Sequence, residues 1–410
     1  MRDMFDPSVI KDDFPILDRV INGKPLVYLD SGATSQKPKV VLNSEREYYE
    51  KHNANVHRGA HTLGDEATAM LAKARSVVAK FVGGKDMETI FVRNTTEAIN
   101  LVAYAWGLDK LRTGDVILST EMEHHANLVP WQQVAKRTGA KIELVKITND
   151  GLLDLEDYKE KLKLKPKVVA LVHVSNALGT INPIKEMSKL AHGVGAVVLI
   201  DGAQAAPHTK VNVGELGCDF YAFSGHKMLA PMGIGVLWGR RELLAEMSPF
   251  LTGGGMINEV CPDHSTWADL PDKFEAGTPN VAGAVGLATA IDYLNGLGMD
   301  AVREHDKAMV AYAIQKLRVV ENVRLLGSRE SEMRSGSVSF EYMGVHAHDV
   351  ATVLDSEGVA VRSGHHCTMV LHKALGLSAS VRASFNVYTT SQDIDALVKA
   401  LGKVKKVFGK

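Results

Sequence analysis

The sequence contains little cysteine, almost no net charge and no long apolar run, and each of these shortages excludes a class of protein. Three cysteines are too few and too scattered for a disulfide framework. A formal net charge of −1 gives no electrostatic sign of binding to nucleic acid or to an anionic membrane. No apolar run approaches the roughly 18 residues of a membrane-spanning helix, and the acidic start of the chain is not typical of a secretory signal. We therefore expect a cytoplasmic protein whose partners include no nucleic acid and no membrane.

The composition and the order of the apolar runs predict the fold class. With 410 residues, of which 45% are hydrophobic and 23% charged, the chain is typical of a soluble protein of two domains with a large core. Short apolar runs alternate with helical patterns, which predicts an α/β protein with a mainly parallel, doubly wound sheet. After a loop-rich stretch and a glycine-rich helix, strands and helices continue in a mixed pattern. We predict a large domain over 25–295 and a smaller α+β domain formed by 1–24 and 296–410.

Polar residues follow the predicted strands at the points where the strands end: Thr95, His124, Asn176, Asp201, Gln204 and Lys227. Because the carboxyl ends of parallel strands lie at one edge of a sheet, we expect these side chains to meet in one site. A pyridoxal phosphate site needs a lysine for a Schiff base and an acid for the pyridinium nitrogen, and Lys227 and Asp201 supply both. Taken alone, the two are explained equally well as ordinary charges on surface loops.

Three other features have a second interpretation. The turn Asn94-Thr95-Thr96-Glu97 lies between a strand and a helix and suits an anion such as a phosphate, but the same residue types cap helices. His124 can stack on a planar cofactor, although a surface histidine is the commoner outcome. His57 and His61 are four apart but have no acidic third ligand beside them, so we expect no metal there.

Four motifs, in this order and spacing, resemble those of one enzyme family. They are the segments Glu123-His124-His125-Ala126-Asn127, Asp201-Gly202-Ala203-Gln204, Ser224-Gly225-His226-Lys227 and Arg362-Ser363-Gly364-His365-His366-Cys367. Together they resemble the cysteine desulfurases of the SufS-like group II branch, which are fold-type-I pyridoxal phosphate enzymes of the class V aminotransferase family. The resemblance runs from about Asp6 to the C-terminus. One difference is Thr368, where many relatives have alanine, and we expect it to tune the loop without abolishing the chemistry.

The resemblance implies a role for each matching residue around pyridoxal phosphate. Lys227 would bind the cofactor as a Schiff base and then move the Cα proton of the substrate, and Asp201 would pair with the pyridine nitrogen. Gln204 would hydrogen-bond the ring oxygen, and His124 would stack on the ring. Relatives are homodimers, so Thr278 would be contributed across a dimer. The residues implied for the phosphate are Thr95, Thr96, Ser224, His226 and Thr278.

The resemblance also implies a substrate site and a nucleophile. Arg382 would bind the carboxylate of L-cysteine with the paired contacts that a guanidinium favours, and Asn176 and Arg362 would line the same pocket. Cys367 would take the sulfur as a persulfide, so that alanine is left. A sulfur-acceptor protein of the Suf system, docking near 362–370, would receive the sulfur for iron–sulfur cluster assembly.

Other interpretations remain open at the level of sequence. A selenocysteine lyase with the same fold would not need Cys367, because the C–Se bond needs less help to break. A catalytically idle scaffold would need none of the residues implied for catalysis. A zinc site at His365-His366-Cys367 is disfavoured because consecutive residues rarely converge on one metal. Cys218 is expected to be a small buried apolar residue, and Cys261 to be incidental.

Overall fold

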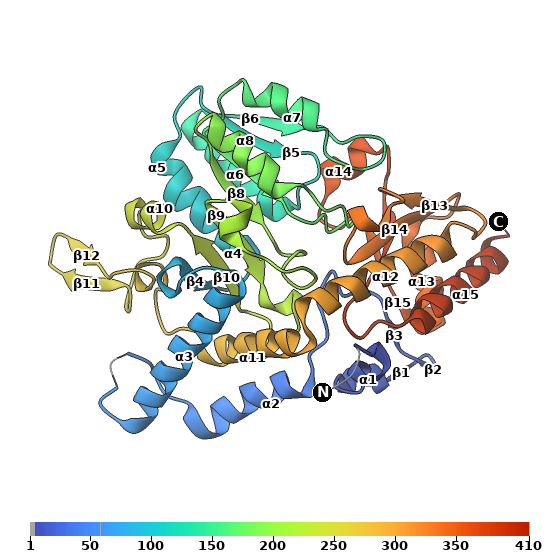
Figure 1. Ribbon diagram of the computed structural model, residues 1–410, viewed down its shortest axis with the longest axis horizontal. Helices are drawn as coiled ribbons and strands as arrows, with labels where there is room; N and C mark the ends of the chain where they lie inside the picture. The colour runs from blue at the N-terminus through green and yellow to red at the C-terminus, as the bar shows by residue number, and fades with distance from the viewer. Residues whose placement is uncertain (1–4, 58, 410) are drawn as a thin grey trace.

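The centre of the molecule is a seven-stranded sheet with the strand order β4-β10-β9-β8-β7-β5-β6 (Figure 1). A computed structural model describes residues 5–57 and 59–409, so residues 1–4, where no secretory signal was expected, lie outside the described part. β10 is antiparallel to both of its neighbours, and the other pairs are parallel. The predicted α/β fold with a mainly parallel sheet is therefore confirmed. The strands are β4 (Thr89–Val92), β5 (Val116–Thr120), β6 (Lys141–Val145), β7 (Val168–Val172), β8 (Val197–Asp201), β9 (Phe220–Ser224) and β10 (Gly235–Gly239).

Both faces of this sheet are buried, which explains why its central strands are continuous apolar runs in the sequence. Successive side chains of a strand point to opposite faces, so in β9 Tyr221 and Phe223 join one core whereas Phe220 and Ala222 join the other. Helices cover the first face with α3 (Thr62–Phe81), α8 (Ile184–Gly193) and α11 (Val281–Leu297). They cover the second face with α4 (Thr95–Val102) and α6 (Val129–Thr138).

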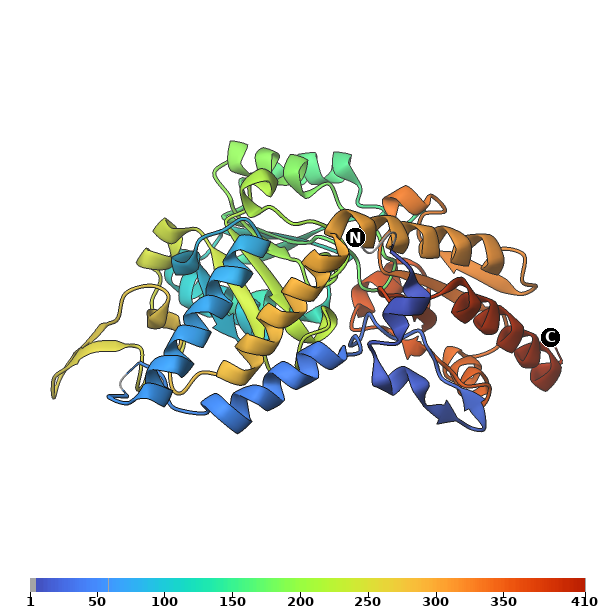
Figure 2. The same ribbon diagram turned by 60° about the horizontal axis from the view of Figure 1, so that its bottom comes forward.

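A second, four-stranded sheet is formed by the C-terminal part of the chain (Figure 2). Its order is β13-β14-β17-β16 and its pairs are antiparallel. The strands are β13 (Val323–Leu326), β14 (Ser337–Tyr342), β16 (Arg362–Gly364) and β17 (Ser380–Ser384). Its core includes residues of the helices α12 (Met299–Leu317), α13 (Ala347–Ser356) and α15 (Ser391–Phe408). Near this sheet, β15 (Val359–Ala360) pairs in parallel with β3 (Val27–Tyr28) from the other end of the chain.

The remaining elements have at most nine residues each. The α-helices are α1 (Pro7–Lys11), α2 (Lys39–Glu47), α5 (Leu108–Lys110), α7 (Leu155–Leu162), α9 (Val213–Leu216), α10 (Arg241–Glu246) and α14 (Met369–Ala374). Single helical turns of other types are η1 (Pro15–Asp18), η2 (Tyr48–His52), η3 (Asp86–Glu88), η4 (Ala103–Gly107), η5 (His125–Asn127), η6 (Gly225–Lys227), η7 (Asp272–Phe274) and η8 (Ser331–Met333). Two-stranded ribbons are formed by β1 (Val20–Ile21) with β2 (Lys24–Pro25), and by β11 (Ile257–Val260) with β12 (Ser265–Trp267).

Two segments expected as loops contain regular structure. The polar, glycine-bearing sequence from Arg362 to Met369 predicts a mobile loop between regular elements. In the structure, its first three residues are β16, which pairs with β17, and α14 begins at Met369. β11 and β12 form a hairpin that projects from the body of the molecule at the left of Figure 1. Most of the hairpin residues are exposed, so no alternation of apolar and polar residues marks these strands in the sequence.

The predicted division of the chain at residue 295 stays a prediction. In the structure, α11 ends at Leu297 and α12 begins at Met299, with Gly298 between them. Within the described ranges, no helix is both long and apolar enough to cross a membrane.

Candidate active site

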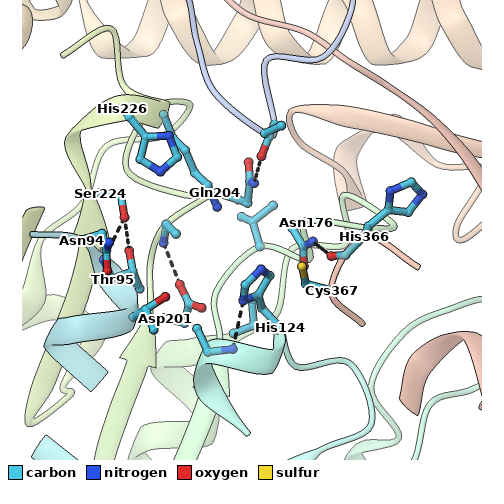
Figure 3. A pocket seen from close by; sticks show the side chains of 18 of the residues that line it. Asn94, Thr95, His124, Asn176, Asp201, Gln204, Ser224, His226, His366 and Cys367 are labelled. Carbon is cyan, nitrogen blue, oxygen red and sulfur yellow. Dashed lines mark hydrogen bonds between the residues drawn. The ribbon is translucent and has the colours of Figure 1, made fainter. Parts of the chain in front are cut away.

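A pocket of about 310 Å³ lies between the large sheet and the four-stranded sheet. Lys227 and Cys367, which are far apart in the sequence, line this same pocket. Figure 3 shows how the polar side chains from the two parts of the chain surround it. All the predicted site residues except Thr278 contribute to its lining: Thr95, Thr96, His124, Asn176, Asp201, Gln204, Ser224, His226, Lys227, Arg362, Cys367 and Arg382. Residues from separate strand ends therefore meet, as the parallel sheet predicts.

One end of the pocket is built from the N-terminus of α4. The side chain of Asn94 caps the helix by accepting from the Glu97 N–H at 3.0 Å. The Thr95 N–H donates to Ser224 Oγ at 2.8 Å, and the two hydroxyls lie 2.7 Å apart (Figure 3). Gly235 is needed here, because a Cβ on it would lie 2.6 Å from Asn94 Cα. The turn is thus both a helix cap and a polar recess whose helix dipole favours an anion.

Lys227 ends the short helical turn η6, directly after β9. The carbonyl of the preceding residue, His226, accepts from Ser35 N at 2.9 Å, Ser35 Oγ at 3.0 Å and Thr34 Oγ1 at 3.1 Å. These contacts fix the backbone from which the lysine extends. Burial lowers the pKa of Lys227 to about 8, against the opposing effect of Asp201. Near neutral pH an appreciable share of this amine is uncharged, which is the form that attacks a carbonyl.

Asp201 is the last residue of β8 and is buried. One of its oxygens, Oδ1, accepts from the Ala203 N–H at 3.0 Å. Burial raises the pKa of Asp201, whereas the charge of Lys227 lowers it. Beside it, Gln204 Nε2 donates to the Gly32 carbonyl at 2.7 Å. An amide nitrogen carries two hydrogens, so a second donor of Gln204 remains for a ligand.

His124 is neutral in the pocket. Its Nδ1 accepts from the Ala126 N–H at 3.0 Å (Figure 3), which places the ring hydrogen on Nε2. Burial, with a smaller effect of Lys227, lowers the pKa of His124 to about 3. The adjacent Glu123 is buried and ties this turn to β7, because its Oε1 accepts from the Val172 N–H at 2.9 Å. Glu123 belonged to a motif recognised in the sequence, yet sequence reasoning gave it no role.

Arg362 and Arg382 share one acid, Asp30, which sequence reasoning also did not select. Arg362 makes a two-pronged contact, from Nε to Oδ1 at 3.1 Å and from Nη2 to Oδ2 at 2.9 Å. Arg382 Nη2 lies 3.2 Å from Oδ1, and its Nη1 donates to the Asn176 carbonyl at 2.8 Å. Two guanidinium groups facing one carboxylate leave an excess of positive charge, which suits a substrate carboxylate. The only feature of the sequence that could have indicated a role for Asp30 is its place after a predicted strand, at the start of a turn made of small residues.

The three cysteines occupy different environments. Cys218 is buried, and burial raises the pKa of its thiol to about 12, as expected for an inert residue. Cys261 is half-buried and follows β11 on the projecting hairpin. Cys367 is exposed and also lines the pocket. It is thus the cysteine placed to meet both a ligand inside the pocket and a partner outside it.

Thr278 does not line this pocket. It is exposed and lies in a separate surface depression together with Tyr48, Asn53 and Pro279. Its predicted contribution across a dimer stays a prediction.

The residues present fit pyridoxal phosphate. The pocket has a volume in the range of small-molecule sites, a helix N-terminus for the phosphate, an amine of lowered pKa and a buried acid. Buried Asn176 Oδ1 and Arg382 Nε have no hydrogen-bond partner, as expected of groups that await a polar ligand. Among the described residues, no group of three or more His, Cys, Asp and Glu side chains is placed to hold a metal ion. Fold and site together define a fold-type-I pyridoxal phosphate enzyme.

Comparisons with known proteins identify the family. Residues 27–397 match the class-V aminotransferase family. A probable cysteine desulfurase of Halalkalibacterium halodurans is 51% identical over 401 residues, which is 98% of each chain. The apo structure of a cysteine desulfurase from Thermococcus onnurineus NA1 has a TM-score of 0.94 at 41% identity and covers 99% of this chain and 100% of that one. The cysteine desulfurase CsdA of Escherichia coli has a TM-score of 0.91 at 37% identity, with coverage of 99% and 100%. The chain belongs to the class-V aminotransferase family and, within it, to the cysteine desulfurases.

Proposed function

We propose that the residues of the pocket divide into a cofactor group and a substrate group. Thr95, Thr96, Ser224 and His226 hold the phosphate of pyridoxal phosphate at the N-terminus of α4. Around the ring, Lys227 is the covalent anchor, Asp201 pairs with the ring nitrogen, Gln204 donates to the ring oxygen and His124 stacks on the ring. When bound, the cofactor withdraws electrons from the carbon skeleton of the amino acid that it holds.

The substrate group holds L-cysteine by its carboxylate. Arg382, with Arg362 and Asn176 beside it, supplies the positive charge and the donors for that carboxylate. Lys227, whose pKa of about 8 lets it exist as a free amine, takes the Cα proton of the substrate and returns a proton to the product.

Cys367 accepts the sulfur. Its thiolate attacks the sulfur atom of L-cysteine, an S–S bond forms, and the C–S bond of the substrate breaks. The electron pair of the broken bond and a proton stay with the carbon skeleton, which leaves as L-alanine, and a persulfide remains on Cys367. The observation that carries this proposal is that Cys367 lines the same pocket as Lys227 and is exposed at its mouth.

The persulfide then passes to a protein acceptor that supplies iron–sulfur cluster assembly. The acceptor docks near 362–370, where Cys367 and Met369, two residues apart, are both exposed. The enzyme acts in the cytoplasm, where a reducing medium keeps the thiol free, and as a homodimer in which Thr278 of a second copy completes the phosphate site.

Mass spectrometry tests the sulfur-transfer step. After incubation with L-cysteine, a peptide containing Cys367 should carry one additional sulfur atom, and L-alanine should form. Cys367→Ala should abolish both, whereas Cys261→Ala, which removes the cysteine on the hairpin, should change neither. Alanine formation by Cys367→Ala at the wild-type rate would contradict the proposal. If that variant is slow on L-cysteine but keeps its rate on L-selenocysteine, the alternative of a selenocysteine lyase is favoured.

The acceptor is tested by comparing turnover with candidate acceptor proteins and with dithiothreitol. We expect one protein to raise turnover above the level reached with the free thiol. Met369→Glu should weaken the stimulation by that protein and leave turnover with dithiothreitol unchanged. If the free thiol matches every candidate acceptor, no protein partner is needed.

A further inference from the structure

The turn that carries Cys367 has an unfavourable backbone conformation. His366 and Cys367 have φ values of 51° and 59°, the left-handed region that side chains with a Cβ rarely adopt. Two such residues in succession persist only where neighbouring groups hold them. The structure must therefore contain contacts that hold this turn.

Every carbonyl from residue 365 to residue 368 accepts a hydrogen bond. The donors are the Thr368 N–H and hydroxyl to His365 O at 2.8 and 2.7 Å, Asn176 Nδ2 to His366 O at 2.6 Å (Figure 3), the His125 N–H to Cys367 O at 2.8 Å, and the His372 ring to Thr368 O at 3.0 Å. The two donors of Thr368 belong to the turn itself, whereas Asn176 follows β7 and His125 begins η5, in the segments that follow strands of the large sheet. The backbone that carries Cys367 is thus held by hydrogen bonds both from within its own turn and from the segments of the large sheet that face it.

A buried chain of side chains lies under the turn. His366 Nε2 is 2.9 Å from Ser380 Oγ, which is 3.0 Å from His372 Nε2. His372 Nδ1 in turn lies 3.0 Å from Thr368 O and 3.3 Å from the Thr368 hydroxyl. All four residues are at most 7% exposed. His366 contributes to the pocket lining, but in Figure 3 its ring lies away from the centre of the pocket, on the side of the turn that it supports.

The direction of each hydrogen bond follows from chemistry. A carbonyl only accepts, so His372 Nδ1 carries its hydrogen toward Thr368 O and its Nε2 accepts. Ser380 then donates to His372 and accepts from His366 Nε2. Burial lowers the pKa of both histidines, that of His366 to about 2, so neither ring is charged. Each hydrogen bond of the chain therefore has one direction: His366 donates to Ser380, Ser380 donates to His372, and His372 donates to Thr368.

Building on the proposed function, we propose that Thr368, through the chain Thr368–His372–Ser380–His366, is a positioning residue that aims Cys367 at the substrate sulfur. Its hydroxyl is the link: it donates to His365 O and accepts from the His372 ring, so it joins the start of the turn to the buried chain. We expect the chain to act on the sulfur-transfer step, because its side-chain hydrogen bonds run to one another and to the carbonyls of the turn. Its contact with a residue proposed for the substrate is made by the His366 carbonyl, which accepts from Asn176 Nδ2. This gives a structural basis for the expectation that Thr368 tunes the loop.

The test compares two variants of the cofactor-loaded enzyme. Thr368→Val keeps the shape of threonine without the hydroxyl, and Thr368→Ser keeps the hydroxyl. We expect Thr368→Val to lower kcat for alanine formation roughly three- to tenfold, with KM and the cofactor absorbance change on mixing with L-cysteine unaltered. Thr368→Ser should recover most of that loss. Amide hydrogen exchange of a peptide spanning 365–369, measured without substrate, should be faster in Thr368→Val than in the wild type and in Thr368→Ser.

A matched control is Thr389→Val, which removes another buried threonine hydroxyl, one that accepts from the Asn386 N–H at 2.9 Å. It should leave kcat and exchange at 365–369 unchanged. If Thr368→Val fails to fold, His372→Asn, which keeps an N–H near the position of Nδ1 but cannot reach Ser380, should give the same fall in kcat. The proposal is overturned if the variant that folds, Thr368→Val or His372→Asn, has the kcat of the wild type. It is also overturned if Thr368→Ser does not recover the kcat that Thr368→Val loses.

Cys367→Ala separates this proposal from the proposed function. If Cys367→Ala itself forms alanine at the wild-type rate, the proposed function fails. If Cys367→Ala is inactive and Thr368→Val is as fast as the wild type, only the positioning role of Thr368 fails.

Discussion

At the scale of single residues, the pocket changes the protonation of the groups that line it. Burial lowers the pKa of Lys227 to about 8 and that of His124 to about 3. A lysine with an ordinary pKa of 10.5 would be only roughly 0.3% uncharged at pH 8, whereas Lys227 is then about half uncharged. His124 stays neutral throughout the physiological range. The pocket thus presents a reactive amine and an uncharged ring at neutral pH.

The first prediction concerns the pH dependence of cofactor binding. The neutral amine is the reacting form, and the folded protein lowers the pKa of Lys227, so the rate should rise with pH and level off above about 8. Stopped-flow absorbance of the apoenzyme mixed with pyridoxal phosphate measures this rate. Nα-acetyl-lysine amide, as the control, should continue to rise toward about 10.5. Asp201→Asn should move the midpoint lower, because the charge of Asp201 raises this pKa. A midpoint near 10 for the enzyme would show that the amine is not buried.

At the scale of elements, the polar recess at the N-terminus of α4, where we propose that the phosphate binds, depends on how closely two strands approach one turn. β10 presents Gly235 directly against the backbone of Asn94, the cap of α4. The close approach lets Ser224, at the end of the neighbouring β9, reach the Thr95 N–H. Any side chain on β10 at this point would push the helix N-terminus out of position.

The second prediction tests this contact with Gly235→Ala. The added Cβ would lie 2.6 Å from Asn94 Cα, where only backbone can give way. We expect a loss of about 1–3 kcal/mol in the free energy of unfolding and at least roughly tenfold weaker cofactor binding. Chemical denaturation and fluorescence titration measure the two effects. Gly193→Ala, on the helix α8, is the control: a Cβ there meets no atom within 4 Å, so stability and cofactor binding should not fall. Unchanged cofactor affinity in Gly235→Ala would contradict the assigned recess.

At the scale of the whole molecule, the site is made from two sheets that are far apart in the sequence. Asp30, near the N-terminus, makes ion pairs with Arg362 and Arg382 of the four-stranded sheet. A third contribution, from Thr278 of a second copy, is proposed to complete the site. Assembly of two copies would then be part of catalysis and not only of stability.

The third prediction tests that contribution by mixing two inactive variants. Lys227→Ala lacks the amine, and Thr278→Ala lacks the hydroxyl proposed to act in the other subunit. In a mixed dimer one of the two sites would have both residues, so activity at limiting cofactor should return to about half of the wild-type level. Differently tagged variants, co-expressed and purified through both tags, provide the mixed dimer. Each pure variant, treated in the same way, is the control. No gain in the mixed dimer would mean that Thr278 serves its own subunit or no site.

The sequence by itself determined the strands of the large sheet and most of the residues that line the pocket. Strands buried on both faces, such as β7 and β9, are visible as apolar runs because every position must be apolar. The polar residues that follow them were predicted to meet, since parallel strands end at one edge. The hairpin of β11 and β12 was missed because its exposed residues carry no such pattern.

Only the tertiary structure decided which groups hold the site residues in place. Asp30 between two arginines, Glu123 behind His124 and the buried chain under Cys367 join residues up to hundreds of positions apart. Their contacts depend on the distances and directions of single hydrogen bonds, and no local pattern of residue types encodes these. The antiparallel β10, which brings Gly235 to the cap of α4, is likewise a property of the assembled sheet. Residue types and their order thus set which chemistry is available, whereas packing set the geometry in which it operates.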